Sequence, residues 1–388
     1  MRTLVRPDAA VQRVAECCAA ATTGHDLFER LSQEMHDLIT HDGAVWFGAD
    51  PATLLVTSPV RVEALEDSCC DVYWHNEFHV QDAARYVDLA RSPVPAASLQ
   101  LATDGRPGRS ARYRELLEPQ GYVDELRGVL RLGDNTWGML GLFRERGRAA
   151  FSEADVALLG RCSSVIGRAL RDHVRAQSPW LGTACAPGLV VFDERSRVTS
   201  ANPEALTWLR ALLPDGAREA ANDVPVVSAV EELLAADARH RHASPVWALL
   251  NRARASDGGF DGHAARLRMR DMRGRWLVLH GSRLRARNDD TGGSVAVVIE
   301  PAKSAEIAPI IVEAYALTAR ERDVVGALAR GESTSEIAAH LFLSQHTVRD
   351  HIKTVFEKLE VSSRTELVAK LFTEHYTAPA HADMVHPR

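Results

Sequence analysis

This sequence has few aromatic residues (6%), no long apolar run and no excess of positive charge. The longest apolar segments, such as 188–192 and 295–299, have the length of strands and fall far below the ~20 residues that a membrane span needs. Charged residues between Arg2 and Glu16 interrupt the stretch where a secretory signal would have to be apolar. We therefore expect a cytoplasmic protein that does not enter a membrane.

The motifs of common catalytic and metal sites are also missing. The sequence has no Walker A phosphate loop, no G-x-S-x-G nucleophile elbow and no H-E-x-x-H zinc helix. Its six cysteines form no C-x-x-C pair, and His240 and His242, two positions apart, would point away from each other on a helix. We therefore expect no catalytic residue, no metal and no cofactor, and we do not expect an enzyme.

Length and charge limit the organisation of the chain. At about 150 residues per domain, 388 residues favour three domains. The 52 acidic side chains outnumber the 46 basic ones and give a formal net charge of −6. No global positive field is available to attract nucleic acid, so any DNA-binding surface must be small and confined.

The first 178 residues alternate helical and strand-like patterns. Apolar residues at helical spacing follow Asp26, and two strand-like segments, 125–132 and 136–143, flank the turn sequence Gly133-Asp134-Asn135 and predict a hairpin. A long helix follows, with Ser152 as its predicted N-cap. This combination resembles a GAF sensory domain with a core at about residues 20–175. The resemblance implies an α+β domain that binds a small ligand or mediates dimerisation.

Five aromatic residues are the candidates for lining a GAF cavity. Packing in the core remains the alternative for each of them, because aromatic side chains are common in protein interiors. A small-molecule effector would have to contact some members of this set: Trp46, Tyr73, Trp74, Phe78 and Trp137.

Residues 182–302 begin and end with strand pairs. Segments 188–193 and 197–200 predict two short strands, and Asn202-Pro203 leads into a helix. Two further strands are expected at 276–283 and 294–300. This arrangement is similar to a PAS domain, whereas the pattern of residues 214–255 assigns that stretch to no particular element.

The sequence after Leu317 gives clear signals for four consecutive helices. Thr318-x-x-Glu321, Ser333-x-x-Glu336 and Ser363-x-x-Glu366 are capping boxes, and Gly331 is typical of a residue that ends a helix. Ser344 is expected to cap the third of these helices. The apolar side chains of the third helix recur as one continuous stripe, which leaves its other face polar: Val348, Ile352, Val355, Phe356 and Leu359.

The second and third of these helices satisfy the requirements of a helix-turn-helix at about residues 334–353. The third helix would read DNA through the exposed side chains of its first half: Gln345, His346, Arg349, Asp350 and Lys353. Arginine can bind guanine in bidentate fashion, lysine suits guanine or phosphate, and aspartate can accept from cytosine N4. Thr347 and the amino end of the helix suit a phosphate.

These motifs closely resemble the DNA-binding domain of LuxR/FixJ-type regulators over residues 315–373. The residues that carry the resemblance are Leu317–Glu321, Gly331, Glu336–Ala338, Leu341, Leu343–Ser344, Thr347–His351 and Lys358–Leu359. The resemblance implies an all-α, four-helix domain whose third helix enters the major groove and whose fourth supports a dimer. Asp350 departs from the neutral or basic residues that are commoner at its position. The complete expected DNA-binding set is Ser344, Gln345, His346, Thr347, Arg349, Asp350, Lys353 and Lys358.

Local charge also favours a dimer. The basic residues between 317 and 373 are Arg320, Arg322, Arg330, Arg349, Lys353, Lys358, Arg364 and Lys370. They are balanced by Glu321, Asp323, Glu332, Glu336, Asp350, Glu357, Glu360 and Glu366. A monomer with no net positive charge should make few phosphate contacts and bind weakly.

The sequence thus predicts a multidomain α+β protein: a GAF-like domain at 1–178, a PAS-like domain at 182–302, a linker at 303–314, the helix-turn-helix domain at 315–373 and a disordered tail at 374–388. Its expected function is transcriptional regulation as a homodimer on double-stranded DNA. A small-molecule effector and RNA polymerase are further candidate partners. The alternative is a ligand-binding receptor or an enzyme in which the C-terminal helices serve only for assembly.

Overall fold

The computed structural model describes residues 7–65, 70–176, 186–212, 225–236, 244–255, 264–272, 274–284, 293–302, 306–307, 310, 313–315 and 317–368. The chain forms two compact units. The first comprises Met1–His173, Cys185–Arg273 and Leu277–Glu300, and the second comprises Val174–Ala184, Gly274–Trp276 and Pro301–Arg388. None of the helices within the described ranges has the length and apolar character needed to cross a membrane.

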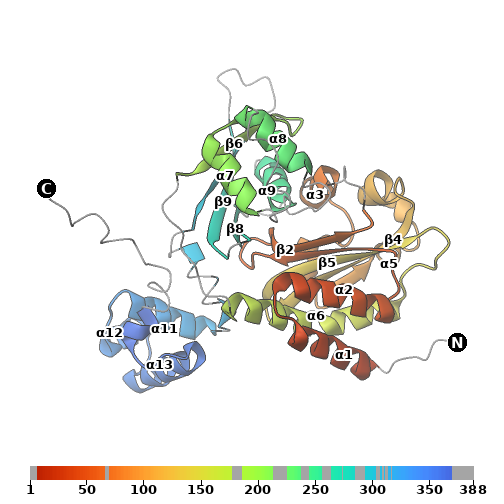
Figure 1. The fold of residues 1–388 in the computed structure, drawn as a ribbon. Helices are drawn as coiled ribbons and strands as arrows, with labels where there is room; N and C mark the ends of the chain where they lie inside the picture. Colours follow the sequence, from red (N-terminus) through yellow and green to blue (C-terminus); the bar gives the residue numbers. More distant parts are fainter. Residues whose placement is uncertain are drawn as a thin grey trace. The chain divides into compact units, whose positions relative to one another are not determined.

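The first unit contains a five-stranded antiparallel sheet with the order β2-β1-β5-β4-β3. Three of its strands, β2, β5 and β4, are labelled in Figure 1. The strands are β1 (Gly43–Ala49), β2 (Val56–Glu63), β3 (Ala96–Ser98), β4 (Tyr122–Leu132) and β5 (Asn135–Glu145). β4 and β5 form the hairpin that the turn sequence predicts, with Leu132 paired to Asn135. Both of these strands extend beyond the predicted segments, because their pairing continues past the apolar positions.

Helices precede, interrupt and follow this sheet. They are α1 (Pro7–Ala20), α2 (Gly24–Leu38), α3 (Cys70–His79), α4 (Tyr86–Arg91), α5 (Leu99–Ala102) and α6 (Glu153–Ala176), with short turns at Pro107–Arg109 and Tyr113–Leu117. α6 confirms the predicted long helix, and the Ser152 hydroxyl accepts from the backbone of Asp155. α6 packs so closely on β4 that a Cβ at Gly167 would lie 2.9 Å from the backbone of Arg131. Glycine therefore permits this helix to lie against the sheet.

A second five-stranded sheet in the same unit has the order β7-β6-β10-β9-β8. Its strands are β6 (Gly188–Phe192), β7 (Val198–Ala201), β8 (Arg266–Arg270), β9 (Trp276–Arg283) and β10 (Val295–Pro301). Three helices accompany it: α7 (Pro203–Leu212), α8 (Val226–Ala236) and α9 (Ser244–Ala255). The predicted strand pairs at both ends of this segment are confirmed, and α8 and α9 lie in the stretch that the sequence pattern could not assign.

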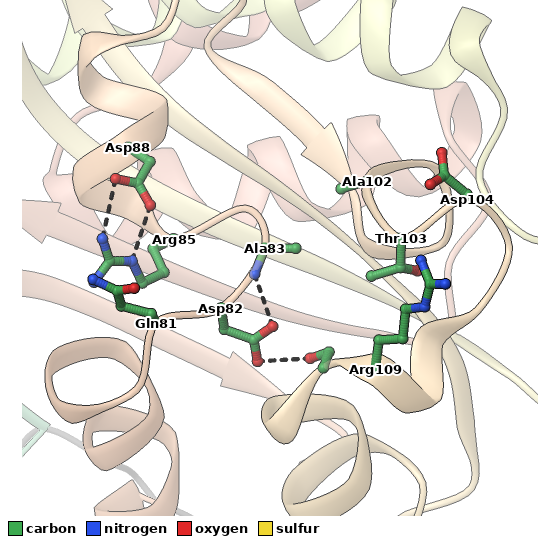
Figure 2. Close-up of a pocket in the computed structure, with 10 residues that line it drawn as sticks. Gln81, Asp82, Ala83, Arg85, Asp88, Ala102, Thr103, Asp104 and Arg109 are labelled. Atoms are coloured by element: carbon green, nitrogen blue, oxygen red, sulfur yellow. Dashed lines mark hydrogen bonds and ion pairs between the residues drawn. The ribbon is translucent and has the colours of Figure 1, made fainter.

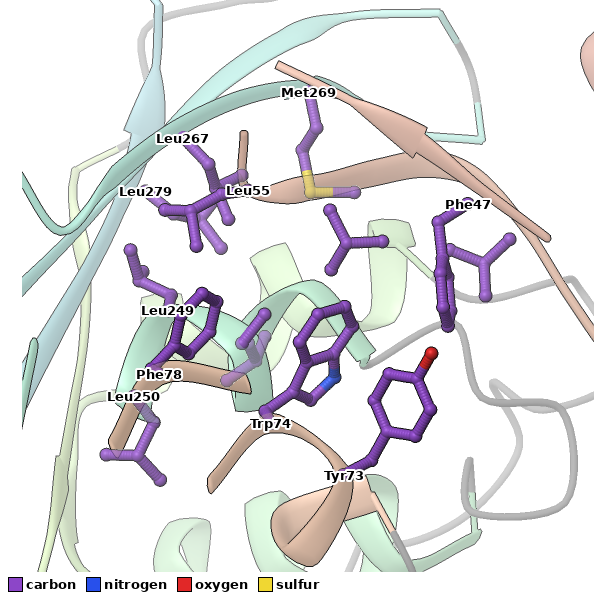
Figure 3. Close-up of a cluster of buried hydrophobic side chains, with 14 of the residues drawn as sticks. Phe47, Leu55, Tyr73, Trp74, Phe78, Leu249, Leu250, Leu267, Met269 and Leu279 are labelled. Carbon is purple, nitrogen blue, oxygen red and sulfur yellow. The ribbon is translucent and has the colours of Figure 1, made fainter. Parts of the chain in front are cut away.

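The two sheets share one hydrophobic core (Figure 3). Phe47 of β1 and three aromatic residues of α3 belong to the same buried cluster as Leu249 of α9 and Met269 of β8. A buried ion pair reinforces this packing, because the Arg268 guanidinium donates to both carboxylate oxygens of Asp50 at 2.8 and 2.6 Å. The segments that the sequence divides into a GAF-like and a PAS-like domain therefore pack together as a single unit.

The second unit contains the four C-terminal helices α11 (Ala319–Ala329), α12 (Thr334–Leu341), α13 (Gln345–Leu359) and α14 (Arg364–Val368). The first two capping boxes are present with both of their hydrogen bonds. Gly331 has a φ of 94°, as expected for the residue that ends the first helix. Within the predicted linker, Ile307, Ile310 and Ala314 are buried. The predicted tail at 374–388 lies outside the described residues.

Candidate functional site

The connection between α12 and α13 is a tight turn. α12 ends at Phe342, whose φ of 55° and ψ of 46° are left-handed, and the backbone of Leu343 then donates back to the carbonyl of Ala338. Ser344 begins α13 by accepting a hydrogen bond from the backbone of Thr347 at 3.1 Å. This local chemistry gives two helices joined by a short turn, the arrangement of a helix-turn-helix.

α13 separates its apolar and polar residues onto two faces. Val348, Val355 and Leu359 are fully buried, and these three residues hold the helix against its neighbours. Five of the predicted DNA-contacting residues are exposed on the other side: Gln345, His346, Arg349, Asp350 and Lys353. The structure thus brings these five residues together on one accessible surface, which we call the reading face.

Charges on the reading face are only loosely paired. His346 Nδ1 lies 3.0 Å from Asp350 Oδ2, and Lys353 Nζ lies 3.9 Å from Glu357 Oε1, with every one of these side chains more than 60% exposed. Arg349 has no ion-pair partner among the described residues. Because exposed pairs are weak, the guanidinium and ammonium groups here are available to another molecule.

Three other predicted residues have structural contacts. Lys358 Nζ lies 2.6 Å from Glu321 Oε2 and joins the end of α13 to α11. Although burial alone would raise the pKa of Glu321, the hydrogen bond from Lys358 and those from Thr318 lower it. The hydroxyl of Thr347 lies 2.8 Å from that of Ser344, so both residues stabilise the start of α13. Lys358 therefore lies apart from the reading face.

Several other basic side chains in the described part of this unit also have partners. Arg364 donates to the carbonyls of Leu328 and Glu332, which ties the start of α14 to the end of α11. No sequence signal indicates this contact, because its partners are backbone atoms more than 30 residues away. Ion pairs also hold Arg320, Arg322 and Arg330. On the reading face itself, the positive charge available to DNA comes from Arg349 and Lys353.

Glu360 offers a test of how α13 ends. This residue is the C-cap of α13 and adopts φ 52° and ψ 46°, a conformation that disfavours side chains other than glycine. We expect Glu360→Gly to stabilise the second unit by about 0.5–1 kcal/mol, measured by thermal unfolding of the full chain. The matched control is Glu357→Gly, three residues earlier within the helix, which should destabilise it by about 1 kcal/mol. Equal effects of the two changes would contradict this account.

The five aromatic candidates for an effector site are all buried in the first unit. Tyr73, Trp74 and Phe78 lie together on α3 and contact one another or Phe47 (Figure 3). Trp46 instead lies against Phe28 of α2, with ring centroids 5.7 Å apart. The structure therefore groups three of the five candidates, and it places Trp46 in a separate contact. Trp137 is buried on β5.

An open cavity of about 480 Å³ lies near α3 without involving any of these aromatic residues (Figure 2). Its wall includes the Asp82–Ala83 turn and Ser110. Burial alone would raise the pKa of Asp82, but hydrogen bonds from the Arg112 backbone, Ser110 and the Ala83 backbone lower it. Asp82 therefore carries its charge at neutral pH and fixes the turn.

A cluster of buried charges lies behind this turn, and the sequence analysis missed it. Glu125 accepts from the Nε atoms of both Arg112 and Arg127 at 2.7 Å, and Arg127 Nη1 donates to Glu77 at 2.6 Å. The only available signal was charged residues at alternate positions of an otherwise apolar strand. We call these groups the arginine cluster: Glu77, Arg112, Glu125 and Arg127, with Tyr73 and Tyr86, whose rings lie beneath the Arg127 guanidinium.

Comparison with known proteins identifies the C-terminal helices. Residues 315–371 match the family model described as bacterial regulatory proteins, luxR family. The spore germination protein GerE of Bacillus subtilis is 46% identical over 55 residues, which cover 14% of this chain and 74% of that protein. The chain belongs to the luxR family. The family resemblance predicted for this segment is confirmed.

Another curated relative also matches over a short part of the chain. The uncharacterized transcriptional regulatory protein YhcZ of Bacillus subtilis is 48% identical over 62 residues, which are 16% of this chain and 28% of YhcZ. The chain thus spans only about a quarter of that relative. A solved complex of Vibrio cholerae VqmA with ligand and DNA aligns with 50% of this chain and 84% of VqmA, at 17% identity and a TM-score of 0.21. A superposition of that quality supports no inference about this chain.

Proposed function

We propose that this luxR-family chain is a sequence-specific DNA-binding transcriptional regulator in which α13 enters the major groove. The single observation that carries the proposal is the reading face, where Arg349 and Lys353 are exposed while Val348, Val355 and Leu359 fix the helix from behind. Few free positive charges mean few phosphate contacts for one domain, so we propose a homodimer on a two-fold symmetric site. With DNA as its partner, the protein would act in the cytoplasm, where RNA polymerase is a further candidate partner.

The first unit is proposed to modulate DNA binding as a sensor. Two five-stranded sheets with the same strand order, each accompanied by helices, support a GAF-like and a PAS-like region. Their shared core supports a unit that would respond as one body to an effector. We assign no enzymatic reaction and no cofactor to this unit. Regulation by a small molecule is the role that best fits the arginine cluster, whose charges are buried next to an open cavity.

Arg349→Ala tests the proposed reading helix. We expect the change to weaken binding to the specific DNA site by about 1–3 kcal/mol, because a bidentate contact to a base is lost. The site is first recovered by genome-wide mapping of bound DNA, and affinity is then measured by fluorescence anisotropy at constant salt.

The matched control is Arg320→Ala, which removes an exposed arginine of α11 that is 59% exposed and lies outside the reading face. This variant should bind the recovered site about as tightly as the unmodified protein. Unchanged binding by Arg349→Ala would remove this residue from the interface. Failure to recover any DNA site would favour the alternative in which the C-terminal helices serve only for assembly.

A further inference from the structure

The arginine cluster contains more hydrogen-bond donors than acceptors. Both guanidinium groups are completely buried, yet Arg112 Nη1 and Arg127 Nη2 have no hydrogen-bond partner among the residues that the structure describes. Each of these nitrogens carries two hydrogens, and leaving a buried charged donor unpaired is costly. Native proteins rarely tolerate such groups unless water or a ligand satisfies them.

The tyrosine pair adds another donor. The hydroxyls of Tyr73 and Tyr86 lie 2.8 Å apart, so one donates to the other and the second hydrogen has no acceptor among the described residues. Burial raises the pKa of both phenols, and both therefore keep their protons at neutral pH. The adjacent α3 residue Asn76 contributes one unpartnered acceptor, its Oδ1 atom. Unpaired hydrogen-bond donors therefore outnumber unpaired acceptors in and around the arginine cluster. A molecule that satisfies these donors must carry acceptor atoms.

Charge limits what this partner can be. Two guanidinium groups face two carboxylates, Glu77 and Glu125, at contacts of 2.6–2.7 Å, and the cluster is electrically balanced. An additional anion would add an uncompensated buried charge, which is strongly unfavourable. A neutral oxygen acceptor satisfies the donors without disturbing this balance.

The open cavity and the arginine cluster lie on either side of one turn of the chain. The cavity wall contains Asp82 and Ala83, and Arg112 is bonded to both, through its backbone N–H to the Asp82 carboxylate and through Nη2 to the Ala83 carbonyl. The buried guanidinium is thus separated from the cavity by a single turn. Figure 2 places this turn between the Arg85–Asp88 ion pair and Arg109.

We propose that the arginine cluster binds a small neutral molecule through a carbonyl oxygen, which accepts hydrogen bonds from Arg112 Nη1 and Arg127 Nη2. The rings of Tyr73 and Tyr86, which lie against the Arg127 guanidinium, would give this oxygen aromatic surroundings and favour an aromatic carbonyl compound. This inference deepens the proposed sensory role and rests on it. Binding is tested without DNA, so a negative result here leaves the proposed DNA-binding function of α13 intact.

The experiment uses the full chain with ¹⁵N-labelled arginine and four matched probes. Benzamide and acetophenone present a neutral carbonyl, benzoate presents an anion, and ethylbenzene has no oxygen. We expect both neutral carbonyl probes to shift the Arg112 and Arg127 side-chain NMR signals and to raise the Tm. Benzoate and ethylbenzene should bind about tenfold or more weakly, since one adds a buried charge and the other leaves the donors unpaired.

Two variants test whether probe binding depends on the arginine cluster. Arg112→Lys keeps the positive charge but removes both Nη atoms, so benzamide should bind about tenfold more weakly. Arg106→Lys, the same change at an exposed position six residues earlier, should leave binding unchanged. The NMR titration of the unmodified chain remains decisive if Arg112→Lys does not fold. The proposal is wrong if neither carbonyl probe shifts the two arginine signals, if benzoate binds more tightly than benzamide, or if Arg112→Lys binds benzamide normally.

Discussion

Arg268→Met is expected to lower the free energy of unfolding of the first unit by about 3–5 kcal/mol. The Arg268 guanidinium contacts both carboxylate oxygens of Asp50, and its backbone N–H also donates to this carboxylate at 3.1 Å. The Asp50 side chain is completely buried, and that of Arg268 is only 7% exposed. Methionine has a similar apolar length but no charge, so the carboxylate would remain buried without its cation.

Urea denaturation of the full chain, followed by tryptophan fluorescence, measures this loss. Arg197→Met is the matched control, because Arg197 forms an ion pair with Asp193 at 3.0 Å but is 65% exposed. Removing this exposed pair should cost about 1 kcal/mol or less. Adding Asp50→Asn to Arg268→Met should recover part of the stability, because the buried charge is then also removed. Equal losses for the Arg268 and Arg197 variants would show that burial does not determine the value of these pairs.

Helix ends in the second unit could be predicted from the sequence because their causes are local. Thr318 and Glu321 are three residues apart, as are Ser333 and Glu336, and each pair forms both hydrogen bonds of its capping box. The third box differs in detail, since the Glu366 carboxylate accepts from Ser362 and not from Ser363. Which of the two adjacent serines donates to the carboxylate depends on the backbone geometry, and the residue pattern does not specify that geometry.

The packing of the two sheets could not be predicted, because its causes are distant in the chain. Asp50 and Arg268 are 218 residues apart; Asp50 directly follows β1 and Arg268 lies within β8, and the sequence pattern does not link them. The sequence offers Trp74 and Phe78 as candidates for lining a cavity or packing in the core, but nothing in their spacing indicates that α9 and β8 complete their surroundings. Periodicity shows which face of an element is apolar, whereas the partner of that face is decided by the whole fold.

Strand β4 shows a different limit of the same reasoning. Alternating apolar and charged residues normally predict that the charged side chains face solvent. In β4 the buried side includes Glu125 and Arg127, because Arg112 and Glu77 from other elements neutralise them. Inward-facing charge in a strand can therefore be recognised only when its partners are known. A buried charge with several partners is also where a substitution is most damaging.

Glu125→Gln is expected to destabilise the first unit by about 3–5 kcal/mol at neutral pH. Glutamine preserves the shape of the side chain but removes the charge that both Arg112 and Arg127 contact at 2.7 Å. Two buried guanidinium groups would then face only Glu77, which leaves one positive charge uncompensated. Arg61 and Glu63 form a partly exposed pair on β2, so Glu63→Gln is the matched control and should cost about 1 kcal/mol or less.

The pH dependence of the free energy of unfolding distinguishes the contribution of the Glu125 charge from that of its side-chain shape. Burial alone would raise the pKa of Glu125, but the charges of Arg127 and Arg112 outweigh it and lower the pKa below its ordinary value of 4.5. The unfolded chain therefore binds the proton more readily, and the stability contributed by this carboxylate is complete above about pH 4.5 and lost as the pH falls through the folded-state pKa. Glu125→Gln should lack this loss. The free energies of unfolding of the unmodified protein and of the variant should therefore approach each other as the pH is lowered below 4.5. A difference that stays constant over this range would mean that the hydrogen-bonding geometry of Glu125, and not its charge, holds the cluster together.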